Sequence, residues 1–164
     1  MDDPTEQSQW RGLHRLLARM DAEIGQVYTD RDINGLKPSY VLELLRLHAN
    51  GPMTITELAD SVGRTHSALS QKVSAMRTAG LVRTVPGKDA RSKKVTLTAK
   101  SKKLVELLAA EWRATEAAIT ELEAELPYPM TQVVRDVEAA LARKSFHDRI
   151  TEKLRESDVP EGDK

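Results

Sequence analysis

Small polar residues recur at helical spacing between Arg64 and Thr78, and they are the sequence's clearest candidates for chemistry. A glutamine amide can form two hydrogen bonds to an adenine edge, and a serine hydroxyl can bond a base or a phosphate. A face of such small side chains lets a helix approach the floor of a groove, although an ordinary exposed helix face has the same composition. We assign base contacts to Thr65, His66, Ser67, Ser70, Gln71 and Ser74.

The residues around this face are basic. The chain of 164 residues has a formal net charge of zero, but residues 64–103 hold 11 Lys or Arg and one acidic residue, Asp89. The balance is −4 over residues 1–63 and −6 over residues 104–164. A cationic middle segment indicates a polyanionic partner, with a solvated basic surface as the alternative.

Six of these cations are assigned to DNA. Arg91 is expected in a minor groove, because its flat cation suits the narrow, electronegative groove of A·T-rich sequence. The alternative is a solvated surface loop. Phosphate contacts, which fix register without selecting sequence, are assigned to Arg64, Lys72 and Arg77, and contacts from a loop to Lys88, Arg91 and Lys93.

Two short helices are predicted to carry the polar face. Thr54 and Glu57 have the spacing of a capping box, in which each side chain satisfies a free amide at the start of a helix. Gly63 supplies a turn, Thr65 caps the second helix, and Gly80 ends it. The second helix has an apolar stripe of Leu69, Val73 and Met76, which is expected to face the core.

A hairpin follows these helices. Leu81–Val85 and Lys93–Leu97 are short β-branched stretches joined by a polar, basic loop. Two helices with a glycine turn, followed by a basic hairpin, form a winged helix-turn-helix.

Long amphipathic helices flank this segment. Apolar residues at steps of three or four predict helices over Trp10–Tyr28 and from about Ala99. Further apolar residues predict a helix from Pro38 and a last one from about Thr131. The fold class is therefore mainly α with a small β-hairpin wing. Their apolar seams favour a homodimer, with packing inside one chain as the alternative. The expected organisation is an N-terminal dimerisation helix (1–35), the DNA-binding domain (36–98), C-terminal dimerisation helices (99–156) and a frayed tail (157–164).

The motifs Asp89-Ala90-Arg91 and Val95-Thr96-Leu97-Thr98, after the two helices, resemble the MarR family of bacterial transcriptional regulators. The similarity runs from about Leu36 to Thr98. It implies a homodimer that places one winged domain on each half of a palindromic operator. It also implies DNA contact for Ser67, Ser70, Gln71 and Arg91.

The same resemblance implies a small aromatic or phenolic ligand in a crevice between the dimer helices and the winged domain. Other members of this family sense oxidants through cysteine, and this mechanism is excluded here because the chain has no cysteine. The candidate lining residues of this crevice are Trp10, His14, Tyr40 and His48. For each of them, ordinary packing within a helix is the alternative explanation.

Several function classes are disfavoured. Without cysteine there are no disulfides, thiol nucleophiles or cysteine-ligated metals, and the four histidines lack ligand spacing. No glycine-rich phosphate loop is present. We therefore expect no enzyme, metal or cofactor. The chain starts without a signal-peptide pattern and has no bilayer-length apolar run, so a cytoplasmic location without membrane contact is expected.

These patterns predict a sequence-specific, double-stranded DNA-binding regulator, and the resemblance implies a dimeric repressor released by a small aromatic ligand. The alternative is a helical protein–protein adaptor, which the local charge of the middle segment disfavours.

Overall fold

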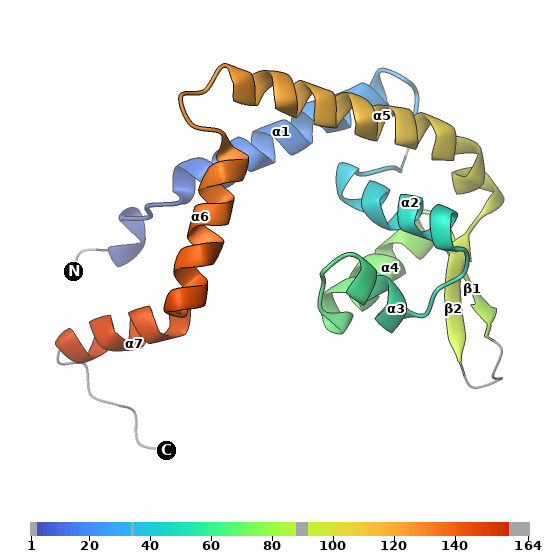
Figure 1. The fold of residues 1–164 in the computed structure, drawn as a ribbon. Coiled ribbons are helices and arrows are strands. Elements are labelled where there is room, and N and C mark those ends of the chain that lie inside the picture. Colours follow the sequence, from blue (N-terminus) through green and yellow to red (C-terminus); the bar gives the residue numbers. More distant parts are fainter. Residues whose placement is uncertain (1–2, 34, 88–91, 158–164) are drawn as a thin grey trace. The chain divides into compact units, whose positions relative to one another are not determined.

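A computed structural model describes residues 3–33, 35–87 and 92–157. The chain divides into two compact units, Met1–Trp112 and Arg113–Lys164. In the first unit, a cluster of three short helices, α2, α3 and α4, packs beside a hairpin (Figure 1). The elements of this unit are η1 (Pro4–Glu6), α1 (Arg11–Thr29), η2 (Pro38–Tyr40), α2 (Val41–Asn50), α3 (Ile55–Ser61), α4 (His66–Thr78), β1 (Val82–Pro86), β2 (Lys93–Leu97) and the first half of α5 (Ala99–Ala124).

The hairpin is antiparallel, and its register places Val82 opposite Leu97. Both residues are buried, so this face of the hairpin packs on the core. Met53 extends the sheet beside β2 through a two-way backbone bridge with Val95, with N···O distances of 3.0 and 2.7 Å. The predicted mainly helical fold with a small hairpin wing is confirmed.

The core of the first unit lies between the short helices, the hairpin and the start of α5. The helix stripes predicted from spacing supply most of it, because apolar residues three or four apart share one helix face. Tyr28 near the end of α1 also enters this core, and its hydroxyl donates to Glu111 Oε2 of α5 at 2.7 Å. The largest fully buried apolar side chains are Leu44, Leu58, Leu69, Met76, Leu81 and Leu108.

Thr98 and Ser101 join the hairpin to α5. They cap the helix reciprocally: the Ser101 hydroxyl accepts from the Thr98 N–H at 3.1 Å, and the Thr98 hydroxyl accepts from the Ser101 N–H at 3.3 Å. The same hydroxyls also donate to the carbonyls of Leu81 (2.5 Å, from Ser101) and Gly80 (2.8 Å, from Thr98). These bonds hold the start of α5 against the segment between α4 and β1.

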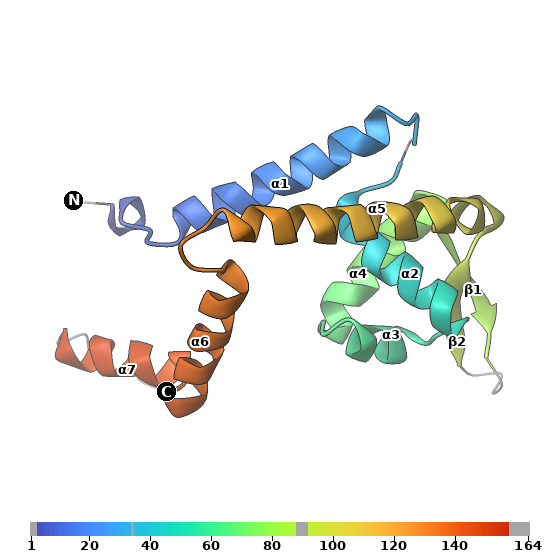
Figure 2. The same cartoon turned by 45° about the horizontal axis from the view of Figure 1, so that its top comes forward.

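The second unit contains the end of α5, α6 (Met130–Arg143) and α7 (Phe146–Glu156), shown from a second direction in Figure 2. None of its described residues, 113–157, is buried. Many of its large apolar side chains are exposed, among them Leu122, Leu126, Val133, Val134, Leu141, Phe146, Ile150 and Leu154.

The prediction of one continuous last helix is wrong. The chain leaves helical geometry at Lys144 (φ −150°, ψ 117°), and Ser145 starts α7 by accepting from the Asp148 N–H at 3.0 Å. Arg149 then bonds the carbonyls of Lys144 and Ala140 at the end of α6. The apolar face also changes here, because Leu141 and Ile150 lie nine residues apart and would stand on opposite sides of one continuous helix. A serine cap and a change of apolar face therefore mark the start of a new helix.

In the part of the chain that the structure describes, no helix is both long and apolar enough to cross a bilayer.

Candidate nucleic-acid interface

The two faces of α4 differ as predicted. Leu69, Val73 and Met76 are buried. The six residues assigned to base contacts lie away from that stripe, and Gln71 is among the five that are exposed. Only Ser70 is half-buried. Thr65 has a second role, because its hydroxyl caps the helix by accepting from the Ala68 N–H at 3.3 Å.

The end of α4 is defined by Gly80. With φ at +70°, it adopts the left-handed conformation that glycine takes without a Cβ penalty. Its N–H bonds the carbonyl of Arg77, and the N–H of Leu81 bonds the carbonyl of Met76, both at 2.9 Å. This pair of bonds is a Schellman motif. The polar face therefore lies on a helix that is capped at both ends.

The predicted phosphate contacts separate into two kinds. Arg64 and Arg77 are exposed, as is Lys93 at the start of β2. Lys72 is held within the fold, where its ammonium donates to Glu43 Oε1 at 2.8 Å and to the Ser39 carbonyl at 2.7 Å. Its charge is thus already compensated by a carboxylate of α2. The other two loop residues, Lys88 and Arg91, lie outside the described residues.

Two further cations occupy the hairpin, and the sequence interpretation gave them no role. Arg83 is exposed on β1. Lys94 of β2 lies 3.8 Å from Glu57 Oε2 of α3. Hydrogen bonds from Thr54 hold the pKa of Glu57 below its usual range, and the charge of Lys94 acts in the same direction. Glu57 therefore completes the predicted capping box and also links α3 to the wing strand.

The four candidate ligand residues are not brought together. Trp10 and His14 are exposed at the start of α1, whereas Tyr40 is buried in the core. His48 alone among them lines a cavity of about 560 Å³. The other lining residues are Leu47, Gly51, Pro52, Arg83, Val85, Thr96, Leu97 and Lys102. This lining contains no acidic residue.

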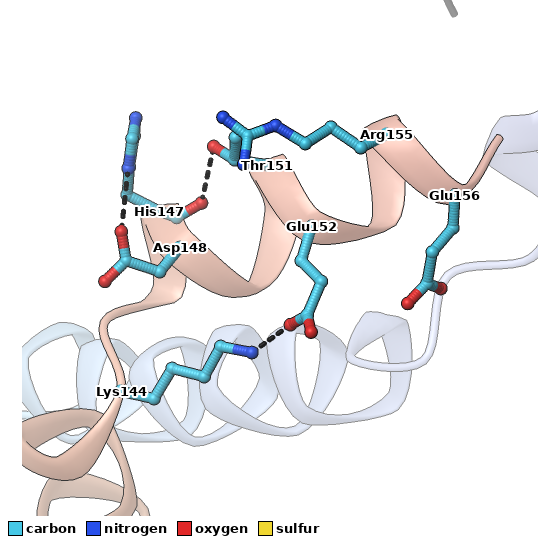
Figure 3. Close-up of a pocket in the computed structure, with 7 residues that line it drawn as sticks. All are labelled: Lys144, His147, Asp148, Thr151, Glu152, Arg155 and Glu156. Carbon is cyan, nitrogen blue, oxygen red and sulfur yellow. Dashed lines mark hydrogen bonds and ion pairs between the residues drawn. The ribbon is translucent and has the colours of Figure 1, made fainter. Parts of the chain in front are cut away.

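A second hollow lies along α7 in the other unit (Figure 3). Its acidic side chains already have partners: Glu152 pairs with Lys144, Glu156 pairs with Lys153 at 2.6 Å, and Asp148 accepts a hydrogen bond from the Ser145 hydroxyl at 2.7 Å. No cluster of His, Cys, Asp or Glu in the described chain is suited to hold a metal ion. This hollow therefore offers no uncompensated charge of the kind found at the first cavity.

Comparison with known proteins identifies the fold. A family model described as HVO_A0114 matches residues 41–104, and no curated protein matches the chain. The solved structure of S. aureus MepR with DNA is 18% identical, with a TM-score of 0.60, and the match covers 83% of this chain and 97% of that one. The M. tuberculosis regulator MOSR with DNA is 25% identical, with a TM-score of 0.59, covering 84% and 99%. A MarR protein from Peptoclostridium difficile is 19% identical, with a TM-score of 0.56, covering 87% and 91%.

The chain has the MarR winged-helix fold. The resemblance that the sequence motifs indicated is thereby confirmed at the level of the fold. Within that fold, α3 and α4 are the helix-turn-helix, α4 is its second helix, and β1 with β2 forms the wing.

Proposed function

We propose that this chain is a transcriptional regulator that binds double-stranded DNA through α4. The observation that carries the proposal is the exposed face of small polar side chains on a capped second helix, within the segment whose charge is +10. Two proteins of the same fold, MepR and MOSR, have been solved with DNA. Gln71 and Ser67 are proposed to contact bases, and Arg64 and Arg77 to contact phosphates.

A homodimer is proposed to present two copies of α4. The second unit leaves its apolar side chains exposed, including Phe146 at 66% and Val134 at 50%. Burial of one exposed apolar side chain contributes about 1.5–3 kcal/mol. Association with a second copy that covers this surface would therefore stabilise the dimer. Closed two-fold pairing is the commonest way to cover such a face. The operator of such a dimer is a near-palindrome. We propose that the protein is cytoplasmic and acts as a repressor of transcription.

The cavity at His48 is the place proposed for a small ligand. Arg83 and Lys102 form no ion pair with any described residue, so both cations are free to meet an anion. An aromatic acid offers a carboxylate for these cations and an apolar body for Leu47 and Val85. Bound there, it would contact the wing and weaken DNA binding.

Selection of bound duplexes from a random pool tests the proposal. We expect an enriched near-palindrome whose half-sites are about 10–10.5 base pairs apart, centre to centre. Gln71→Ala should blur one position in each half-site, and Arg77→Ala should leave the consensus unchanged. Sedimentation with the selected duplex should show two chains per site. Failure to enrich any sequence, with binding that is insensitive to salt, would favour the protein–protein adaptor.

A further inference from the structure

A buried ion pair ties α4 to α2. Glu43 is fully buried, and its Oε1 accepts from the Lys72 ammonium at 2.8 Å. Its other oxygen, Oε2, has no hydrogen-bond partner among the described residues. The Lys72 side chain is only 20% exposed. Such a pair carries a large desolvation cost, so it is weak evidence for stability and calls for another explanation.

Lys72 stands on the inward side of α4. Leu69, Lys72, Val73 and Met76 follow the i, i+3, i+4, i+7 spacing of one helix face. Apolar contacts of that stripe are non-directional, whereas charged hydrogen bonds have preferred lengths and angles. The bonds of Lys72 therefore add a constraint on how far α4 is rotated about its axis.

The other end of this constraint lies at the start of α2. Lys72 also donates to the Ser39 carbonyl at 2.7 Å, and Ser39 belongs to η2, the turn that packs against α1. The carboxylate of Glu43 lies in the first turn of α2. The Lys72 ammonium thus joins α4 to the junction of α1, η2 and α2.

We propose that Lys72 and Glu43 are positioning residues for DNA recognition. Gln71 is adjacent to Lys72 in sequence, so the rotation that Lys72 fixes also fixes the direction of Gln71. This inference rests on the proposed function of α4. Glu43, a buried acidic residue that touches no DNA, then determines how sharply bases are discriminated. Lys72 contributes orientation, and Arg64 and Arg77 contribute phosphate affinity.

A double-mutant cycle tests the pair without DNA. Lys72→Met and Glu43→Met each leave one charge buried without its partner, and each should raise the unfolding equilibrium constant by about 100-fold or more. The double variant replaces both charges by apolar groups of similar size, so it should recover most of that loss. Additive losses would overturn the pairing. If a single variant does not fold, folding of the double variant is still required by the proposal.

DNA binding by the double variant then separates orientation from charge. The ratio of operator to random-sequence affinity should fall on the order of tenfold, the size of one lost base contact. The slope of log affinity against log salt should stay at the wild-type value. Arg77→Met is the matched control, since it removes an exposed cation from the same helix. It should reduce the magnitude of the slope by about 0.9 per subunit.

Two results would overturn the positioning role. One is a salt dependence of DNA binding by the double variant that is as weak as that of Arg77→Met. The other is an unchanged ratio of operator affinity to random-sequence affinity. If the wild-type chain selects no DNA sequence, the proposed function fails instead, and the stability cycle alone decides whether the pair anchors α4.

Discussion

Ser101→Ala tests the junction between the wing and α5. The Ser101 side chain is fully buried, and the substitution removes one oxygen without opening a large cavity. The two shortest hydrogen bonds that are lost run to the Leu81 carbonyl and from the Thr98 N–H, and two contacts of 3.2 Å to the Thr98 hydroxyl and carbonyl are lost with them. Each of the two shortest bonds is worth about 1 kcal/mol. The Leu81 carbonyl still accepts from the Thr98 N–H at 3.1 Å, so neither group is left unpaired. We therefore expect a loss of about 2 kcal/mol.

Thermal and urea unfolding at one fixed protein concentration measure this loss. About 2 kcal/mol corresponds to a fall in Tm of roughly 4–8 °C for a chain of this size. Ser61→Ala is the control, because its hydroxyl donates to Leu58, a carbonyl of its own helix, and the change should stay within about 0.5 kcal/mol. Equal effects of the two substitutions would show that the Ser101 bonds do not hold the wing to α5.

Three further predictions concern single side chains. Gln71→Ala should cost about 1–3 kcal/mol of discrimination at one base pair, with unchanged affinity for random DNA, as competition binding will show. Asp32→Gly should raise the unfolding free energy by about 0.5 kcal/mol in urea titrations, because Asp32 has a φ of +55°. The lowered pKa of Glu57 means that its stabilisation is present above the ordinary value of 4.5 and is lost as the pH falls through the lower folded value. The Tm difference between wild type and Glu57→Gln should therefore vanish in acid; a constant difference from pH 3 to 7 would contradict this.

Local signals in the sequence were sufficient to predict α3 and α4, the helix-turn-helix. The capping box at Thr54 and Glu57, the cap at Thr65 and the stop at Gly80 all depend on groups within five residues of one another. Such interactions are set by backbone geometry that is the same in any fold. For that reason the bounds of α3 and α4 could be predicted closely, whereas their tertiary partners could not.

Lys72 shows where this reasoning stops. The sequence interpretation assigns it a phosphate contact beside the polar face, whereas the structure places it on the inward side of α4 with Leu69 and Met76. The deciding contact is the hydrogen bond to Glu43, which lies 29 residues earlier in the chain. The sequence around Lys72 contains no signal that Glu43 lies beside it in the fold. Tertiary packing also explains why the four candidate ligand residues do not line one cavity. Tyr40, for example, is buried in the core.

The break before α7 was detectable. Ser145 and Asp148 have the spacing of an N-terminal cap, and the apolar face shifts across them, because Leu141 and Ile150 lie nine residues apart. A serine that precedes an acidic residue by three positions should therefore be tested as a helix start wherever the apolar face also shifts.

Under the proposed function, the constraints on α4 explain how a helix with so few large outward side chains can discriminate between DNA sequences. Thr65 caps its start, the bonds around Gly80 cap its end, and the proposed role of Lys72 is to fix its rotation, so apart from Thr65 the outer face is not needed to hold the helix in place. That face can then keep small residues that permit close approach to a groove. It follows that base preference can change through Ser67 or Gln71 at little cost in stability, whereas the sharpness of any preference depends on the buried pair behind them.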